Sequence, residues 1–405
     1  MLGSCVVPLV AWQRMHLSGQ SAEEGEAAMM KALLYAFCTC ALGTLPPGIA
    51  QATPWPFLVF EEGFHVLEGS ELQIENMPRT TNQQGFGNCF AHSAAMIFNF
   101  YACRSQGIDC QSAPMNQLAS TLDMTRFGSM PEGEPDYLSS YSRIDEGGSG
   151  ALALQISTVL VGTVASEACF PAETLYKDMV ASDQRLSSDQ LHLQRNNLER
   201  LKAFYETYRD FVPPCVDCPL EDADPVLEFS QLSNAQPTAE QLYQALGEAT
   251  FGAFLGSAIF PQPCSEAVGR AHFEFKDSMV FKYYPRAEKQ RNYASVMASI
   301  KKSIRANNPV LLQNVCVKEE GESCFKGDEN GHSVVIYGYR RMCADDEIEC
   351  YDALRIKNSW GEQWQREHDD GWVAAGEMLD STGYRKGILS WLDFAGTDKG
   401  QRASR

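Results

Sequence analysis

A cysteine at the start of an apolar, helix-like run is the feature that most restricts how this chain can fold. Cys89 stands in the segment Gly87-Asn88-Cys89-Phe90-Ala91, and the apolar run continues to Phe98. A helix N-terminus carries roughly half a positive charge, which favours the thiolate that a nucleophilic cysteine needs. A buried structural thiol is the alternative, because free cysteines are among the most buried residues. The segment predicts a helix that begins near Cys89, with a candidate nucleophile in its first turn.

A histidine and an asparagine lie far downstream, each beside a strand-like run. His332 precedes the run Val334–Tyr339, which is rich in β-branched and aromatic residues, and Leu354–Lys357 is the next such run before Asn358. The two residues are 26 positions apart, which fits one hairpin. An imidazole can take the proton of a thiol, and an amide can orient that imidazole. The sequence therefore predicts that a hairpin from the second half of the chain meets a helix from the first half.

Gln83, six residues before Cys89, and the segment Asn358-Ser359-Trp360-Gly361 complete a pattern that resembles the papain-like, C1-type cysteine peptidases, in a bacterial-looking secreted form. The resemblance implies that Cys89 is the nucleophile, that His332 is the general base and acid, and that Asn358 accepts the imidazole N–H. It also implies that Gln83 supplies the side-chain donor of an oxyanion hole. Losing one such donor typically costs about 3–4 kcal/mol of transition-state stabilisation.

The same resemblance implies a set of substrate-binding residues. An indole would cover the histidine–asparagine bond from water, and a Gly-Gly turn would bind an extended substrate backbone. An ordinary flexible loop is the alternative for that turn. A further glycine would line the pocket for the second residue of the substrate. The residues expected in these roles are Gly87, Gly147, Gly148, Gly331, Trp360 and Trp364.

The fold that this resemblance implies is α+β and two-lobed. Residues 53–175 would form a helical lobe that carries the nucleophile, and residues 291–405 an antiparallel sheet or barrel that carries the histidine and asparagine. In the family the histidine follows the cysteine by about 130–150 residues. Here the interval is 243 residues, so about 100 residues are extra.

The extra residues fall at 176–290 and have helical patterns. Ser187-x-x-Gln190 has the form of a capping box, and apolar residues recur after it at helical spacing. Thr238-x-x-Gln241 opens a second such pattern. We expect a helical insertion, docked on the rest of the protein, that could act as a lid or regulator.

Residues 1–52 are expected to be a leader with a secretory signal peptide. Met30-Lys31 precedes an apolar run, and Ala50-Gln51-Ala52 has the form of a cleavage site. The run is too short for stable insertion into a membrane. Translation is expected to begin at Met29 or Met30. A lipoprotein signal with Cys38 or Cys40 acylated is the rival interpretation. Both place the mature protein outside the cytoplasm, as a secreted, periplasmic or extracellular protein.

The cysteines agree with export. Of 14 cysteines, 11 follow residue 52, and setting Cys89 aside leaves an even number that could form five bridges. Phe86 stands where the family usually has a bridged cysteine, so that bridge is expected to be absent. A zinc site at Cys215-x-x-Cys218 would need a second pair of ligands, and none is evident, so no metal is expected. Local bridges are expected for Cys103/Cys110, Cys316/Cys324 and Cys343/Cys350, while the pairing of Cys169, Cys215, Cys218 and Cys264 stays open.

Three other histidines compete for the role of base. His92 lies one helical turn after Cys89 and is expected to be a packing residue, although the family usually has an apolar aromatic there. A histidine at this position could alter the pH profile. His272 and His368 lie in polar surroundings and are expected at the surface.

The function expected from these features is that of a secreted cysteine endopeptidase that forms a thioester acyl-enzyme on Cys89. Its partner would be a protein or peptide substrate, with no cofactor, and a monomer is favoured. The net charge of −19 argues against nucleic acid as a partner. One alternative is a peptidase-fold binding or regulatory protein with a covered cleft. Another is a Cys-His amidase or transferase of a different family, which usually places an aspartate third.

Overall fold

The long hairpin predicted around His332 forms the centre of an antiparallel sheet. Its two strands pair over eight registered positions, from Val335 opposite Lys357 to Cys343 opposite Cys350. The strand order is β5-β10-β6-β7-β8-β9, and β1 and β2 also pair with β7. The strands of this sheet are β1 (Phe64–Val66), β2 (Leu72–Gln73), β5 (Met279–Tyr284), β6 (Val310–Cys316), β7 (Gly331–Ala344), β8 (Cys350–Lys357), β9 (Trp372–Ala374) and β10 (Leu389–Phe394).

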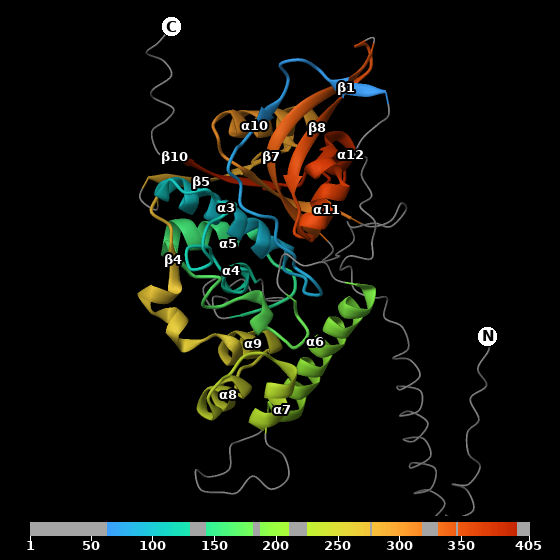
Figure 1. The fold of residues 1–405 in the computed structure, drawn as a ribbon. Helices are drawn as coiled ribbons and strands as arrows, with labels where there is room; N and C mark the ends of the chain where they lie inside the picture. The colour runs from blue at the N-terminus through green and yellow to red at the C-terminus, as the bar shows by residue number, and fades with distance from the viewer. Residues whose placement is uncertain are drawn as a thin grey trace, which may run out of the picture. The chain divides into compact units, whose positions relative to one another are not determined.

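The structure is a computed structural model, shown in Figure 1. It describes residues 63–129, 143–180, 187–209, 225–275, 278–317, 331–345 and 347–394. All of these residues belong to one compact unit. Within these residues the sheet is open, with β5 and β9 at its edges. Of the two forms predicted for the second lobe, a sheet or a barrel, the structure therefore has the sheet. The predicted leader lies outside the described residues.

One buried helix, α3 (Cys89–Gln106), organises the helical part. It begins at Cys89, as predicted, and every residue from Cys89 to Cys103 is buried. A helix that is buried all round lies inside the protein rather than on its surface. Its neighbours on the helical side are α4 (Thr121–Gly128) and α5 (Gly150–Gln155), and the last of these continues into a π-helical turn.

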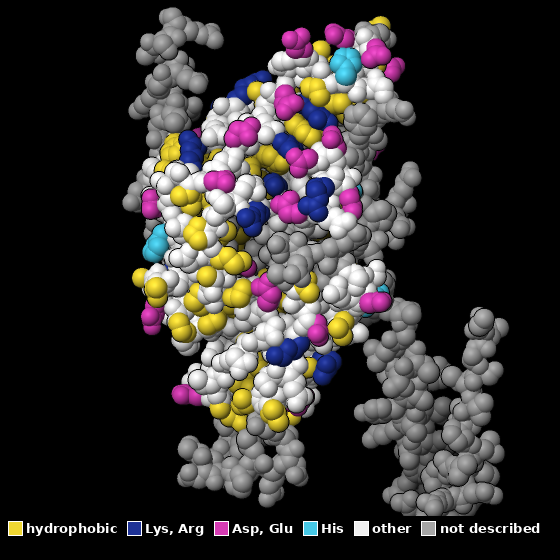
Figure 2. All heavy atoms as spheres, in the orientation of Figure 1, with side chains coloured by type: hydrophobic (Ala, Val, Ile, Leu, Met, Phe, Trp, Pro, Cys, Tyr) yellow, Lys and Arg dark blue, Asp and Glu magenta, His cyan; other side chains and the backbone are white. Residues whose placement is uncertain are grey.

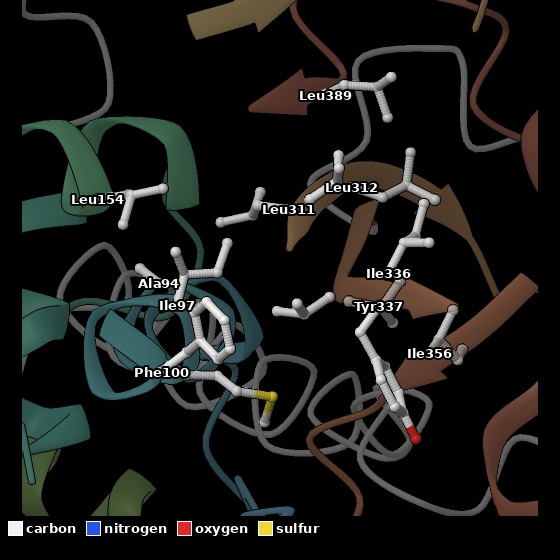
Figure 3. Packing of buried hydrophobic residues seen from close by; sticks show 14 of the residues in the cluster. Ala94, Ile97, Phe100, Leu154, Leu311, Leu312, Ile336, Tyr337, Ile356 and Leu389 are labelled. Carbon is white, nitrogen blue, oxygen red and sulfur yellow. The ribbon is translucent and has the colours of Figure 1, made fainter. Parts of the chain in front are cut away.

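The main core joins α3 to the sheet. Figure 3 shows Ala94, Ile97 and Phe100 of α3 facing apolar side chains of the strands, among them Leu311 and Ile336. Three helices lie between strands of the sheet in the chain order. They are α10 (Tyr293–Arg305) between β5 and β6, α11 (Gly361–Glu367) between β8 and β9, and α12 (Ala375–Asp380) between β9 and β10. The predicted α+β architecture, with Cys89 in a helical part and His332 and Asn358 on an antiparallel sheet, is therefore confirmed.

The predicted insertion has its own aromatic core. Its helices are α6 (Ser188–Tyr208), α7 (Pro225–Leu232), α8 (Ala239–Leu246) and α9 (Phe251–Ile259). Ser187 and Gln190 form the predicted capping box, and Thr238 caps α8. Rings from three of these helices pack together, with 5.2 Å between the centroids of Tyr205 and Phe254. The same core includes Phe86, Leu122 and Ile144 from the helical part, so the insertion is packed on the protein.

Two strands in the range 176–290 were not predicted. Strand β4 (Arg270–His272) pairs with β3 (Thr163–Ala165) in a separate two-stranded sheet, and β5 forms an edge of the main sheet next to β10. The segment is therefore helical only in its first part. The predicted boundaries of lobes and insertion stay predictions.

Three disulfides lie among the described residues. Cys103–Cys110 and Cys343–Cys350 confirm two of the predicted local pairs, and Cys169–Cys264 resolves part of the pairing left open. The cysteines Cys215, Cys218 and Cys324 lie outside the described residues. Among those described, Cys89 is the free cysteine.

The surface in Figure 2 carries acidic and basic side chains interspersed with one another. In the described residues no helix combines the length and apolar character needed to cross a membrane.

Candidate active site

Cys89 is the first residue of α3, and its side chain is 9% exposed. The helix begins here because the carbonyl of Asn88 accepts the N–H groups of Ala91 and His92. The Asn88 side chain donates to Thr125 Oγ1 of α4 over 3.1 Å, which ties this helix start to its neighbour. The cysteine sulfur therefore lies at the positive end of a long buried helix.

His332 and Asn358 meet at the open end of the central hairpin. Asn358 directly follows β8, whose last residue, Lys357, pairs with Val335, three residues after His332. The distance from His332 Nε2 to Asn358 Oδ1 is 2.7 Å. Because the amide oxygen can only accept, this bond requires the proton on Nε2 and leaves Nδ1 free to accept a proton. The Trp360 ring lies 5.0 Å from the imidazole, centroid to centroid.

The hairpin also touches the cysteine. Ser333, the residue after His332, lies close enough to the Cys89 sulfur for its N–H and its hydroxyl to lower the pKa of the thiol. Strand β7 therefore brings the residue next to His332 near the thiol. Ser333 was not singled out from the sequence, although its place beside His332 was a signal that could have found it.

Burial decides the protonation of this pair. It raises the pKa of Cys89 to about 11, against the lowering effect of hydrogen bonds from Ser333 and from the N–H groups of Phe90 and Cys89. Burial also lowers the pKa of His332 to about 4, although the bond to Asn358 acts in the opposite direction. Burial therefore acts against the charged form of each of these two groups.

His92 is buried, as expected of a packing residue, but it is also electrically linked to the site. Its Nδ1 lies 2.6 Å from Thr81 Oγ1. Burial, and then the charge of His332, lower the pKa of His92 to about 3. The two imidazoles therefore disfavour each other's protonation.

Gln83 is held beside Asn358 by the residue between Asn358 and Trp360. The N–H of Gln83 donates to the carbonyl of Ser359 over 2.8 Å, and the Ser359 hydroxyl donates to Gln83 Oε1 over 2.6 Å. The bond from the Ser359 hydroxyl occupies the amide oxygen of Gln83, so Gln83 Nε2 is the group that can donate to a ligand. Ser359 is a second residue that the sequence analysis passed over.

The four predicted catalytic residues are thus joined in a ring of contacts. Cys89 reaches β7 through Ser333, His332 bonds Asn358, and Ser359 bonds Gln83. Gln83 returns to Cys89 through five residues of loop. Folding has brought together groups that are up to 275 positions apart in the sequence.

The predicted Gly-Gly turn is tied to the segment before Cys89. The N–H of Gly147 donates to the carbonyl of Gly87 over 2.9 Å, and the N–H of Gly87 donates to Glu146 Oε1 over 3.1 Å. Gly148 admits no side chain, because a Cβ there would lie 2.5 Å from the carbonyl of Gly128. The turn is therefore a built part of the site and not a loose loop. Gly331 lies apart from it, exposed at the start of β7.

The second tryptophan stacks on a histidine that was expected at the surface. Trp364 contacts Trp360 edge to face at 5.9 Å and lies 4.2 Å from the ring of His368, nearly parallel to it. His368 is partly exposed, which agrees with the expected position at the surface, and its ring stacks on the indole of Trp364. His272 is exposed, as expected.

No protein-family model matches this sequence, and no curated protein matches it. Among solved structures the chain is similar to a number of proteins, including the following three at low identity. Xylellain, a cysteine protease from Xylella fastidiosa, is 15% identical, with a TM-score of 0.40 over 82% of this chain and 87% of that one. A recombinant stem bromelain precursor is 14% identical, with a TM-score of 0.36 over 95% and 96%. Procathepsin B S9 from Trypanosoma congolense is 11% identical, with a TM-score of 0.35 over 86% and 84%.

Proposed function

We propose that this protein is a papain-like cysteine peptidase that hydrolyses peptide bonds through a thioester on Cys89. The observation that carries the proposal is the contact ring, in which a thiol, an imidazole held by an amide and a second amide with a free N–H converge from distant parts of the chain. A thiol, a base and an oriented base partner are the parts that acyl transfer needs.

The first half of the reaction forms the thioester. His332 Nδ1 takes the proton of the Cys89 thiol as the sulfur attacks the carbonyl carbon of the peptide. The carbonyl oxygen becomes an oxyanion, and Gln83 Nε2 and the N–H of Cys89 donate hydrogen bonds to it. The C–N bond then breaks, and the imidazolium gives its proton to the leaving amine. Asn358 keeps the ring oriented throughout, because its oxygen accepts the Nε2 proton.

The second half returns the enzyme to its starting state. A water molecule loses a proton to His332 Nδ1 and attacks the thioester carbon. The C–S bond breaks, and the imidazolium returns the proton to the sulfur, so that a carboxylic acid leaves.

Replacement of the nucleophile tests the proposal directly. We expect Cys89→Ala to abolish hydrolysis of an internally quenched peptide library, whereas Cys110→Ala, which opens the disulfide near the C-terminal end of α3, should leave the reaction in place. When the parent protein is incubated briefly with an activated peptide ester, mass spectrometry should show that the acyl group of this ester forms a thioester with Cys89. Turnover that persists in Cys89→Ala would rule the mechanism out.

A second candidate function is a regulatory or binding protein whose cleft is covered. It is favoured by the burial of the two reacting groups, with Cys89 9% and His332 5% exposed. Thiol reagents of increasing size separate the two functions. If the cleft is open to substrate, a bulky reagent and iodoacetamide should modify Cys89 at similar rates. If iodoacetamide modifies Cys89 and the bulky reagent does not, the cleft is covered and the binding or regulatory function is favoured.

We further propose that the protein works outside the cytoplasm. Disulfides persist in oxidising compartments, and three lie among the described residues. N-terminal sequencing of the protein recovered from its natural host tests this. A mature N-terminus near residue 53 is expected, and an intact leader on a cytoplasmic protein would contradict it.

A further inference from the structure

The segment from Gln83 to Asn88, called here the Gln83 loop, carries the proposed oxyanion donor and ends at the nucleophile. Its residues 84–88 lie outside any helix or strand. Gln84, directly after Gln83, has φ 58°, a left-handed conformation that is uncommon for residues other than glycine. Such a conformation persists only where the surrounding structure holds it. What holds this loop therefore decides where Gln83 points.

The described contacts on the loop come largely from the predicted insertion. The Gln84 side chain is fully buried and bonds both the N–H and the carbonyl of Val180. Gln194 of α6, also fully buried, donates to Gln84 Oε1 over 2.8 Å. The same Gln194 side chain accepts the N–H of Gly85 over 3.0 Å. One amide from α6 therefore holds both a side chain and a backbone group of the loop.

The next residue of α6 extends this grip towards the cysteine. Arg195 Nη1 donates to the carbonyl of Gly85 over 2.9 Å and pairs with Glu146. The Glu146 carboxylate accepts the N–H of Gly87, two residues before Cys89. On the two sides of Phe86, the N–H of Gly85 is therefore bonded by α6, and the N–H of Gly87 by a carboxylate that pairs with α6.

Steric fit leaves little room between the helix and the loop. A Cβ on Gly85 would lie 3.1 Å from Gln194 Cβ and 3.2 Å from the Tyr176 hydroxyl. Phe86 is buried in the aromatic core that α6 shares with α7 and α9. The loop is therefore fixed to the insertion by polar bonds and by an apolar anchor together.

We infer that Gln194 and Arg195 are positioning residues for the peptidase reaction, through which α6 sets the place of Gln83. The inference rests on the proposed function. It assigns the extra residues of this chain a constructive part in the site, where the sequence had suggested a lid or regulator. Neither residue contacts the reacting atoms in this arrangement; both act through the loop.

The test combines substitutions in α6 with the removal of Gln83. In Gln194→Ala and Arg195→Met we expect kcat to fall about ten- to a hundredfold with KM within about twofold, because a displacement of about 1 Å at a catalytic group can cost about 10²-fold. The matched controls are Asn196→Ala, an exposed amide on α6, and Arg200→Met on the next turn. They should keep the parental kcat.

The double variants distinguish positioning from a general structural role. In a Gln83→Ala background, Gln194→Ala should lower kcat by no more than about twofold further, because the donor that it positions is already gone. An undiminished additional loss would overturn the inference, and so would a parental kcat in both single variants. The rate of Cys89 alkylation by iodoacetamide should stay near the parental rate, which also shows that the variants are folded. Should Gln194→Ala fail to fold, the partly exposed Arg195 gives the same comparison.

A failure of the proposed function is recognised separately. If the parent shows no hydrolysis that depends on Cys89, both the function and this inference are refuted. If the parent is active and the α6 variants match it, only the inference is refuted.

Discussion

His332 and Asn358 lie at the ends of two adjacent strands, whereas Gln83 is joined to Cys89 by a loop without strand or helix. In the first region, backbone pairing between β7 and β8 fixes the two side chains, which are 26 residues apart. In the second, side chains from α6, about 110 positions away, fix the loop. One half of the site thus depends on local sheet register and the other on a distant helix.

This difference separates substitutions that damage chemistry from those that damage structure. A side chain at the end of a paired strand can be removed while the hydrogen bonds of the strand remain. A loop that is held by side chains moves when one of those contacts is lost. The first region should therefore give large kinetic effects with small losses of stability, and the second should give both together.

The largest expected effect is from His332→Ala. It removes the base, and we expect kcat to fall about 10⁴-fold or more, as is typical when one member of a cooperating catalytic group is lost. The β7–β8 pairing is unaffected, so the free energy of unfolding should fall only by about 1–3 kcal/mol, the usual cost of leaving a buried acceptor such as Asn358 Oδ1 without its donor. Steady-state kinetics and urea unfolding measure the two quantities.

His272→Ala is the control for this substitution, because that side chain is exposed on β4, away from the hairpin. It should match the parent in both measurements. A His332→Ala protein that retained a tenth of the parental kcat would contradict the assignment of the base. A protein that failed to fold would show that the hairpin end depends on this side chain more than the register indicates.

The next largest effect is expected from Phe86→Ala, in the second region. Phe86 is 2% exposed and packs in the aromatic core of the insertion. Truncating a buried phenylalanine typically costs about 3–5 kcal/mol, partly through the cavity that remains. Because this ring anchors the Gln83 loop, kcat should fall as well. Urea unfolding gives the stability change, and peptide hydrolysis under folding conditions gives the kinetic one.

Leu193→Ala provides the comparison, since Leu193 is an apolar residue on α6 that is 44% exposed. It should cost far less stability and leave kcat unchanged. If Phe86→Ala lost less than about 1 kcal/mol of stability, the insertion would not anchor the loop, and the contrast between the two regions would not hold.

The sequence predicted the first region better than the second, for a physical reason. Strand periodicity, turn residues and the asparagine–tryptophan segment are local patterns, so the hairpin and its two polar ends could be inferred. The bonds between Gln84 and Gln194 join two glutamines with no pattern around them. Nothing local distinguishes a glutamine that will be buried from one that will face water. The capping box predicted that α6 exists and where it begins, but not what it touches.

Short edge strands and burial were the other limits. Strand β4 has three residues, and β5 is paired only through β10, more than 100 positions later, so neither has a strong local signal. The rise in the pKa of Cys89 could not be inferred either, because a helix N-terminus is visible in sequence and the depth of burial is not. The pairing of Cys169 with Cys264 was also left open, because the two cysteines are 95 residues apart and no local pattern joins them.

The smallest expected effect is from His92→Phe, and it depends on pH. His92 has a pKa of about 3 in the folded protein, below its ordinary value of 6.5, with burial as the main cause. Between these values the unfolded chain binds a proton that the folded protein does not, so His92 contributes stability above pH 6.5 that is lost as the pH falls. His332 acts in the same direction, while buried Glu167, whose pKa is raised to about 7, acts in the opposite one.

Because those two groups remain in both proteins, the difference between parent and His92→Phe isolates the contribution of His92. At pH 8 the variant should differ from the parent only by the lost contact with Thr81, about 1 kcal/mol. Between pH 8 and pH 5 the free energy of unfolding of the variant, relative to that of the parent, should rise by about 2 kcal/mol. The reason is that each pH unit below 6.5 costs the parent about 1.4 kcal/mol for a group that cannot protonate in the folded state. Urea unfolding at the two pH values measures this, with His272→Ala as the exposed control. A difference that does not change with pH would mean that His92 accepts a proton within the fold, and the two imidazoles beside Cys89 would then not exclude each other's charge.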